Sequence, residues 1–160
     1  MRDDMEQHPA RSGVCALALS LLLPLARLPA QQLRHPASPK GSIAVGATVR
    51  DSLGRRDVLL AAESTYAQQW KLAGTAGQIV TIDLISDAFD AYAFLLGPGL
   101  DKPPQDDDSG GRCNARLTVR LPQTGDYTIV VTTTDKVVTG PFSLSVSAGT
   151  KPKSLTPCPR

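Results

Sequence analysis

The sequence predicts an all-β fold, an antiparallel β-sandwich of about eight strands. Two observations support this class. Apolar and polar residues alternate over short stretches, and turns rich in glycine and proline separate these stretches at close, regular spacing with little helical pattern between them. Alternation buries one face of each strand, and short turns join antiparallel neighbours.

The clearest strands flank predictable turns. Residues 80–85 alternate directly after the turn at residues 74–77, and residues 117–121 and 127–132 alternate on either side of the turn Pro122-Gln123-Thr124-Gly125. An earlier turn is expected at Asp51-Ser52-Leu53-Gly54. The expected strands are residues 43–49, 57–60, 65–72, 80–85, 92–96, 117–121, 127–132 and 142–146.

Residues 59–72 are ambiguous. Their alanine, glutamate and glutamine residues favour a helix on intrinsic propensity. However, Tyr66, Trp70 and Leu72 share one parity, which places them on one face of a strand. We therefore expect a strand at residues 65–72.

The chain is predicted to carry an export signal ahead of one folded domain. The apolar run at residues 14–26 has the length of a signal-peptide core and is short for a bilayer span. We expect cleavage after Ala30, with an uncleaved anchor as the alternative. The mature protein is then secreted or periplasmic, with no membrane attachment. The predicted parts are a signal peptide (1–30), a linker (31–41), the sandwich (42–148) and a Pro-rich tail (149–160).

The charge and cysteine content limit the function classes further. The formal net charge of +2 is small and evenly spread, which argues against a nucleic-acid or membrane-surface binder. The predicted mature chain keeps two cysteines, Cys113 and Cys158. An even pair in an exported chain predicts a disulfide, and two free thiols are the alternative.

Four segments, in order, resemble the bacterial pre-peptidase C-terminal domain. The most specific features are Ser86 with Phe89-Asp90, the acidic loop after them, and Leu121-Pro122 with Gly125 and Tyr127. The resemblance covers residues 43–147 and implies a secreted β-sandwich of jelly-roll type, usually appended to exported peptidases and other extracellular enzymes. The segments are AGQIVTIDLISDAFDAYAFLLGPG, DDDSGG, ARLTVRLPQTGDYTIVVTT and GPFSLSVS.

The residues that carry this resemblance have physical roles of their own. We expect Ser86 and Asp90 to accept backbone N–H bonds in a tight turn. Gly125 is expected to adopt a positive φ in a short turn. Tyr127 is expected to bury its ring while its hydroxyl reaches a backbone group.

The sequence does not predict an enzyme. Its two histidines, His8 and His35, lie before the predicted sandwich, so no Ser-His or Cys-His pair is available there and zinc is disfavoured. No catalytic domain accompanies the sandwich in this sequence, so we expect a stand-alone module or one that joins a separate partner.

Two binding hypotheses remain. Asp90 with Asp106, Asp107 and Asp108 offers hard oxygen ligands for calcium, and the alternative is a solvated acidic loop. The resemblance adds weight, because related collagen-binding modules of clostridial collagenases bind calcium. The second hypothesis is an aromatic platform for sugar or peptide, with the core as the competing place for its rings. Its residues are Tyr66, Trp70 and Tyr92.

The resulting prediction is a secreted, non-catalytic β-sandwich that binds extracellular protein or polymer, or assists a separate exported enzyme. A carbohydrate-binding module that recognises a polysaccharide is the alternative, and an enzyme of unrecognised type is the third possibility.

Overall fold

The structure is a computed structural model that describes residues 38–159. The predicted signal peptide and most of the predicted linker lie outside these residues. Within them every regular element is a strand, and no helix is long and apolar enough to cross a membrane. The strands are β1 (Gly41–Ser42), β2 (Thr48–Leu53), β3 (Val58–Leu60), β4 (Thr65–Gly74), β5 (Ile79–Ile85), β6 (Ala91–Leu96), β7 (Gln105–Asp106), β8 (Ala115–Arg120), β9 (Gly125–Thr133) and β10 (Gly140–Ala148).

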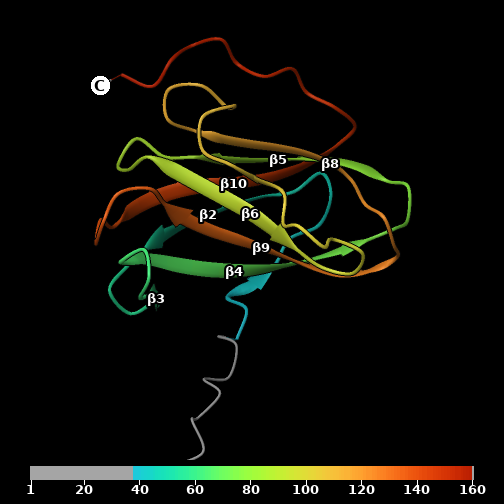
Figure 1. Ribbon diagram of the computed structural model, residues 1–160, viewed down its shortest axis with the longest axis horizontal. Coiled ribbons are helices and arrows are strands. Elements are labelled where there is room, and N and C mark those ends of the chain that lie inside the picture. The colour runs from blue at the N-terminus through green and yellow to red at the C-terminus, as the bar shows by residue number, and fades with distance from the viewer. Residues whose placement is uncertain (1–37, 160) are drawn as a thin grey trace, which may run out of the picture. The chain divides into compact units, whose positions relative to one another are not determined.

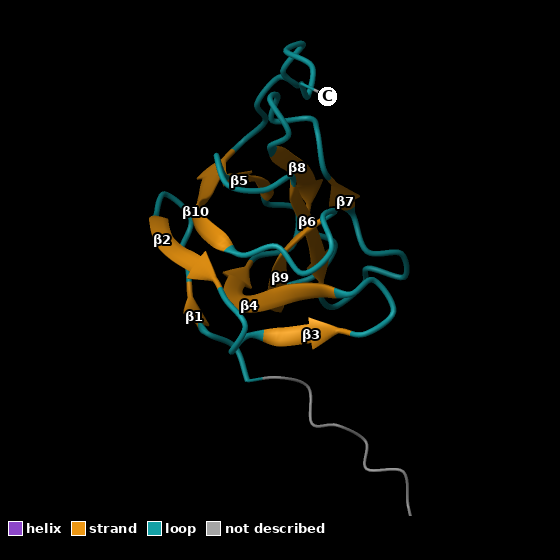
Figure 2. Ribbon diagram, turned by 90° about the vertical axis from the view of Figure 1, so that its left-hand side faces the viewer, coloured by secondary structure: helices purple, strands orange, loops and turns teal. Residues whose placement is uncertain are grey.

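The strands form two sheets that face each other across one core (Figures 1 and 2). The six-stranded sheet has the order β1-β4-β9-β6-β7, with β3 paired to β4. The four-stranded sheet has the order β2-β10-β5-β8. All neighbouring strands are antiparallel except β1 and β4. The predicted all-β sandwich is therefore confirmed, including the strand over the ambiguous residues 65–72.

The core is mainly aliphatic. Fully burying one such side chain contributes about 1.5–3 kcal/mol relative to leaving it exposed. The interior is therefore the main source of the domain's stability. Its fully buried side chains include Leu72 from β4, Ile82 from β5, Leu95 from β6, Ile129 from β9 and Leu144 from β10.

Tyr127 has the corner role that the sequence predicts. Its side chain is 0% exposed, and its hydroxyl donates to the backbone oxygen of Gln123 at 2.6 Å. Gly97 lies against the ring so closely that an added Cβ would be 2.2 Å from Tyr127 Cδ1. The glycine is therefore required by close approach, and the tyrosine fixes the turn that leads into β9.

Two predicted turns differ in the structure. Residues 51–53 are not in a turn but end β2, because pairing with β10 carries Leu53 into the core at 1% exposure. The turn follows at Gly54–Asp57, where the Asp57 N–H donates to the Gly54 oxygen at 3.0 Å. Gly125 lacks the expected positive φ. Instead, a Cβ there would lie 3.0 Å from Pro98 Cγ, so close packing is the constraint.

Candidate functional site

The register of β6 decides which of its side chains face outward. Ala91, Ala93 and Leu95 are 0–1% exposed and face the core. Tyr92 and Phe94 alternate with them, so they face the opposite side of the six-stranded sheet and are only partly buried. The expectation that the core would take Tyr92 is therefore wrong. Small alanines leave the inner positions of β6 to be filled by the facing sheet.

The two outward-facing rings line a groove of about 310 Å³. Its walls come from the β3–β4 connection, from β9 and from the segment before β7. A cavity of this size lies at the small end of the range for ligand sites. The lining residues are Leu60, Glu63, Thr65, Tyr92, Phe94, Pro103, Gln105, Thr132 and Thr133.

A hydrogen bond holds the Tyr92 ring of the groove in place. The Tyr92 hydroxyl donates to Gln105 Oε1 at 2.8 Å, and Gln105 itself pairs with Phe94 across β6 and β7. The centroids of the two rings are 5.9 Å apart, with an angle of 48° between the ring planes. The two rings are therefore tilted to each other rather than stacked face to face.

The groove has a negative electrostatic character. Partial burial raises the pKa of the Tyr92 hydroxyl above its ordinary value, and the carboxylates of Asp107 and Glu63 raise this pKa further. The negative charges of both acids therefore act on the Tyr92 hydroxyl at the rim of the groove. None of its lining residues is a lysine or an arginine.

The predicted platform of Tyr66, Trp70 and Tyr92 is not present as one surface. Trp70 is 8% exposed and belongs to the core, where Gly41 packs closely against its ring. Tyr66 has the parity of Trp70 on β4, whereas Tyr92 lies on the other face of the same sheet. The aromatic pair that shares a face is Tyr92 with Phe94.

Asp90 lies among carboxylates at the start of β6. Burial raises its pKa above the ordinary value, a hydrogen bond from the Thr134 side chain opposes the shift, and Asp108, Asp135 and Asp107 add to it. Its Oδ1 atom is buried and has no hydrogen-bond partner among the described residues. Its backbone N–H, rather than its carboxylate, makes the turn contact, donating to Asp135 Oδ2 at 3.2 Å. The predicted role of Asp90 as a backbone acceptor is therefore wrong.

Other residues of this region have structural roles. Ser86 Oγ accepts the Ala88 N–H at 3.0 Å, as predicted. Asp106 Oδ1 accepts the N–H groups of Ser109 and Arg116 at 2.8 and 2.9 Å, which holds the acidic loop onto β8. Of the four acids predicted as calcium ligands, Asp106 is thus occupied by backbone donors, and Asp107 and Asp108 are exposed near Asp90. Calcium binding here stays a prediction.

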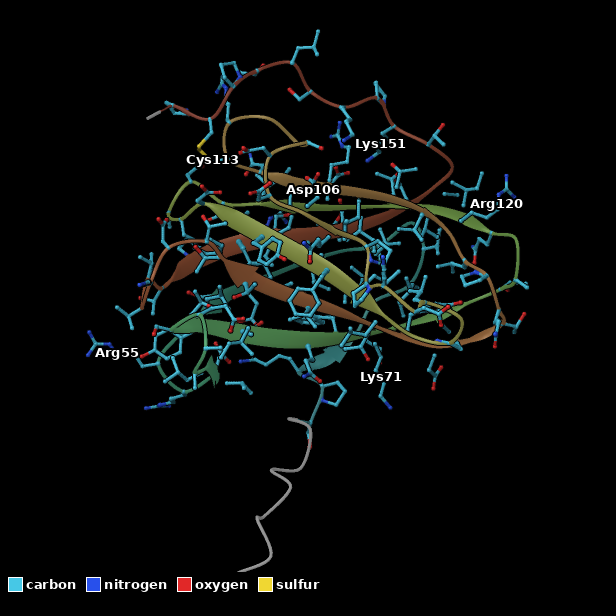
Figure 3. All side chains as sticks on the ribbon, in the orientation of Figure 1. Arg55, Lys71, Asp106, Cys113, Arg120 and Lys151 are labelled. Atoms are coloured by element: carbon cyan, nitrogen blue, oxygen red, sulfur yellow. A yellow bond between two sulfur atoms is a disulfide. The ribbon has the colours of Figure 1, made fainter. Side chains whose placement is uncertain are left out.

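Cys113 and Cys158 form a disulfide in the structure, with their Cα atoms 4.5 Å apart. An oxygen of Asp90 lies within 4.8 Å of both sulfurs. These sulfurs are bonded to each other, so they are not thiolates that could bind a metal. The bond ties the C-terminal segment to the loop before β8 (Figure 3).

The C-terminal segment lies over the four-stranded sheet beyond β10. Lys151 Nζ donates to Asp83 Oδ2 at 2.7 Å, and Arg116 Nε pairs with the other oxygen of the same carboxylate. Asp83 points away from the core on β5 and is nevertheless only 4% exposed. Figure 3 places Lys151, Asp106 and Cys113 on this same side of the domain.

Sequence reasoning missed several residues of these sites. Phe94 was predicted only as part of a strand, and Glu63 only as part of the ambiguous segment. Asp135 lies 45 residues from Asp90 in the chain, and no local pattern connects them. Proximity in a sandwich is set by strand pairing, so these neighbours become visible only in the folded structure.

No protein-family model matches the chain, and no curated protein sequence matches it significantly. Solved structures do match. The chain is similar to the pre-peptidase C-terminal domain of a collagenase from Bacillus anthracis, with 14% identity and a TM-score of 0.52, over 68% of this chain and 96% of that one. The predicted resemblance is therefore confirmed at the level of the fold.

A second solved structure also matches. It is PliG from Aeromonas hydrophila, a periplasmic inhibitor of g-type lysozyme, with 19% identity and a TM-score of 0.48, over 68% of this chain and 96% of that one. PliG from Salmonella Typhimurium matches over the same share of this chain, with 16% identity and a TM-score of 0.46, and over 97% of its own.

Proposed function

We propose that this protein is an exported, non-catalytic β-sandwich that binds an extracellular or periplasmic protein through the outer face of its six-stranded sheet. The observation that carries the proposal is the groove lined by Tyr92 and Phe94. Aromatic residues are enriched at protein interfaces, where a large, rigid ring contributes contact area at small entropic cost. In a chain with only 4% aromatic residues, two of them face outward side by side.

Export is supported by the disulfide. Disulfides persist in oxidising compartments such as the periplasm and the extracellular space, and are rare in the cytosol. The bond between Cys113 and Cys158 agrees with the signal peptide predicted at residues 1–30. The described residues contain no histidine, and no hydrogen bond joins a lining hydroxyl of the groove to the Glu63 carboxylate.

A carbohydrate-binding module is the second candidate. Rings beside amide and hydroxyl groups also bind sugars, and Gln105 and Thr65 supply such groups in the groove. The tilt of 48° between Tyr92 and Phe94 favours a shaped protein surface over a flat platform on which successive sugar rings stack. Assistance to a separate exported enzyme is one form that protein binding takes.

Retention experiments separate these candidates. The purified protein is incubated with insoluble collagen, immobilised secreted peptidases and g-type lysozyme, and in parallel with chitin, cellulose and peptidoglycan. We expect retention by at least one protein and by no polysaccharide. The double variant Tyr92→Ser/Phe94→Ser should abolish retention, whereas Leu155→Ser, which removes a 97% exposed apolar side chain elsewhere, should not. Retention by polysaccharide alone would favour the second candidate.

A further inference from the structure

Two aromatic rings of the groove lie near two carboxylates that form no salt bridge within residues 38–159. Glu63 lines the groove, and Asp107 directly follows β7, whose Gln105 holds the Tyr92 hydroxyl. Neither acid forms a salt bridge with a lysine or arginine among residues 38–159. No lysine or arginine nitrogen of the described residues therefore lies within 4.0 Å of either carboxylate.

This combination favours a cation over other ligands. A ring face attracts a positive charge through its quadrupole. A carboxylate attracts it directly and repels an anion, and these effects are stronger near a partly desolvated groove than in bulk water. The apolar walls, Leu60 and Pro103, suit the aliphatic stem that lies behind the charge of a lysine or arginine.

We propose that the groove binds a lysine or arginine side chain of an extended segment in a partner protein. The proposal rests on the proposed protein-binding function and names the chemistry of its partner. A protein is favoured over a small amine because the apolar surface continues beyond the groove. Val58 and Leu96, which are 40% and 37% exposed, face the same side of the sheet as Tyr92. A segment longer than one residue would cover them.

Two synthetic peptides test the choice of a cation. The probe is a labelled twelve-residue peptide of alanine, proline and three lysines, and its twin carries acetyl-lysine at the same three positions. Acetylation removes the charge and keeps the stem. Using the full chain and fluorescence anisotropy, we expect the twin to bind at least about tenfold more weakly. Added salt should weaken the lysine peptide and leave the twin unchanged.

Single substitutions then test the location. Glu63→Gln and Asp107→Asn should each weaken the lysine peptide by about two- to fivefold, and Tyr92→Leu by about tenfold. Tyr92→Phe keeps the ring and should retain most of the binding. Asp126→Asn is the matched control, because this exposed acid lies at the other end of β9 from the groove. Circular dichroism checks that each variant is folded.

Each outcome decides between the two proposals. Equal binding of the two peptides overturns the cation assignment. So does a loss of lysine-peptide binding in Asp126→Asn that equals the loss in Glu63→Gln or Asp107→Asn. Binding of neither peptide overturns it too, and continued retention by a protein ligand shows that the proposed function survives. Lysine amide serves as a third probe that carries the charge and stem without a peptide segment. If it binds as tightly as the lysine peptide, the assignment to a protein segment is overturned. If the wild-type protein is retained by no protein ligand and also binds neither peptide, both proposals are contradicted.

Discussion

The two sheets differ in how far the rest of the chain covers their outer faces. On the four-stranded sheet, the C-terminal segment covers outward-facing polar residues, so Thr81 and Asp83 are 0% and 4% exposed. On the six-stranded sheet, Tyr92 and Phe94 remain partly open to solvent. A buried carboxylate is thus covered by the protein's own tail, whereas apolar rings are left uncovered.

This contrast is opposite to what burial by polarity alone would produce. Burying a charge is unfavourable unless it is paired and hydrogen-bonded, and Asp83 is paired with both Arg116 and Lys151. Apolar ring surface left in water contributes no burial free energy. A partner that covers the rings buries this surface, which favours binding. The comparison therefore marks the covered face as structural, and it supports the proposal that the open face is the place for binding.

The largest expected effect concerns the bond that holds the covering segment. Cys158→Ser opens a link between residues 45 positions apart, and in the chain-entropy model it should lower the free energy of unfolding by roughly 4 kcal/mol. Urea unfolding measures this change. Reductant should bring the wild type to the same stability, and an unchanged wild type would show that the segment is not held by the disulfide. Binding at the groove should persist in the folded variant.

Adjacent leucines of β6 test which face of this strand is inside. Leu95 is 0% exposed and Leu96 is 37% exposed. Leu95→Ala should cost about 2–5 kcal/mol of unfolding free energy through lost burial and a cavity, whereas Leu96→Ala should stay within about 0.5 kcal/mol. Both are measured by urea unfolding. Equal costs would mean that the outer face is covered as fully as the inner one.

A smaller effect is expected at the buried carboxylate of the covered face. Asp83→Asn leaves Arg116 and Lys151 without their shared anion and should lower the unfolding free energy by about 2 kcal/mol. Lys151→Gln should cost less than about 1 kcal/mol, because the lysine side chain is 40% exposed. A larger cost for Lys151→Gln than for Asp83→Asn would contradict the view that Asp83 anchors the segment.

Asp90 should produce a modest pH dependence. Burial raises its folded-state pKa above the ordinary value of 3.8, so the folded state holds this proton more tightly than the unfolded state. The resulting stabilisation is complete below about pH 3.8 and is lost as the pH rises through the folded-state pKa. Asp90→Asn should therefore melt higher than the wild type at neutral pH, with the difference vanishing toward pH 3.8. Asp87→Asn, at an exposed position, is the control.

The same variant tests the calcium hypothesis. If Asp90 with Asp107 and Asp108 binds calcium, millimolar calcium should raise the melting temperature of the wild type slightly and leave Asp90→Asn unchanged. Calorimetry with and without chelator measures the shift. An identical response of both proteins would remove Asp90 from the ligand set, and no response would remove the site.

The sequence by itself determined the sandwich class, most of the strands and several local contacts. The strand expected at residues 43–49 was wrong, because the structure forms β2 at Thr48–Leu53 instead. Alternation with period two located most of the strands, because one face of each must be buried. Tyr127 was predicted with its hydrogen bond to the backbone, because a buried phenol needs a nearby polar partner and a corner before β9 supplies one. The two cysteines were predicted as a pair by number and compartment, and the structure joins them.

Only the tertiary structure decided which face of β6 is inside and what lies next to it. Ala91–Leu96 is apolar at every position, so alternation could not distinguish the core face from the open one. Pairing with β9 made that choice and turned Tyr92 outward. Leu60 and Thr133 both line the groove. On the covered face, Lys151 forms a salt bridge with Asp83. These neighbours are distant in the chain because antiparallel pairing brings together residues that no local pattern links.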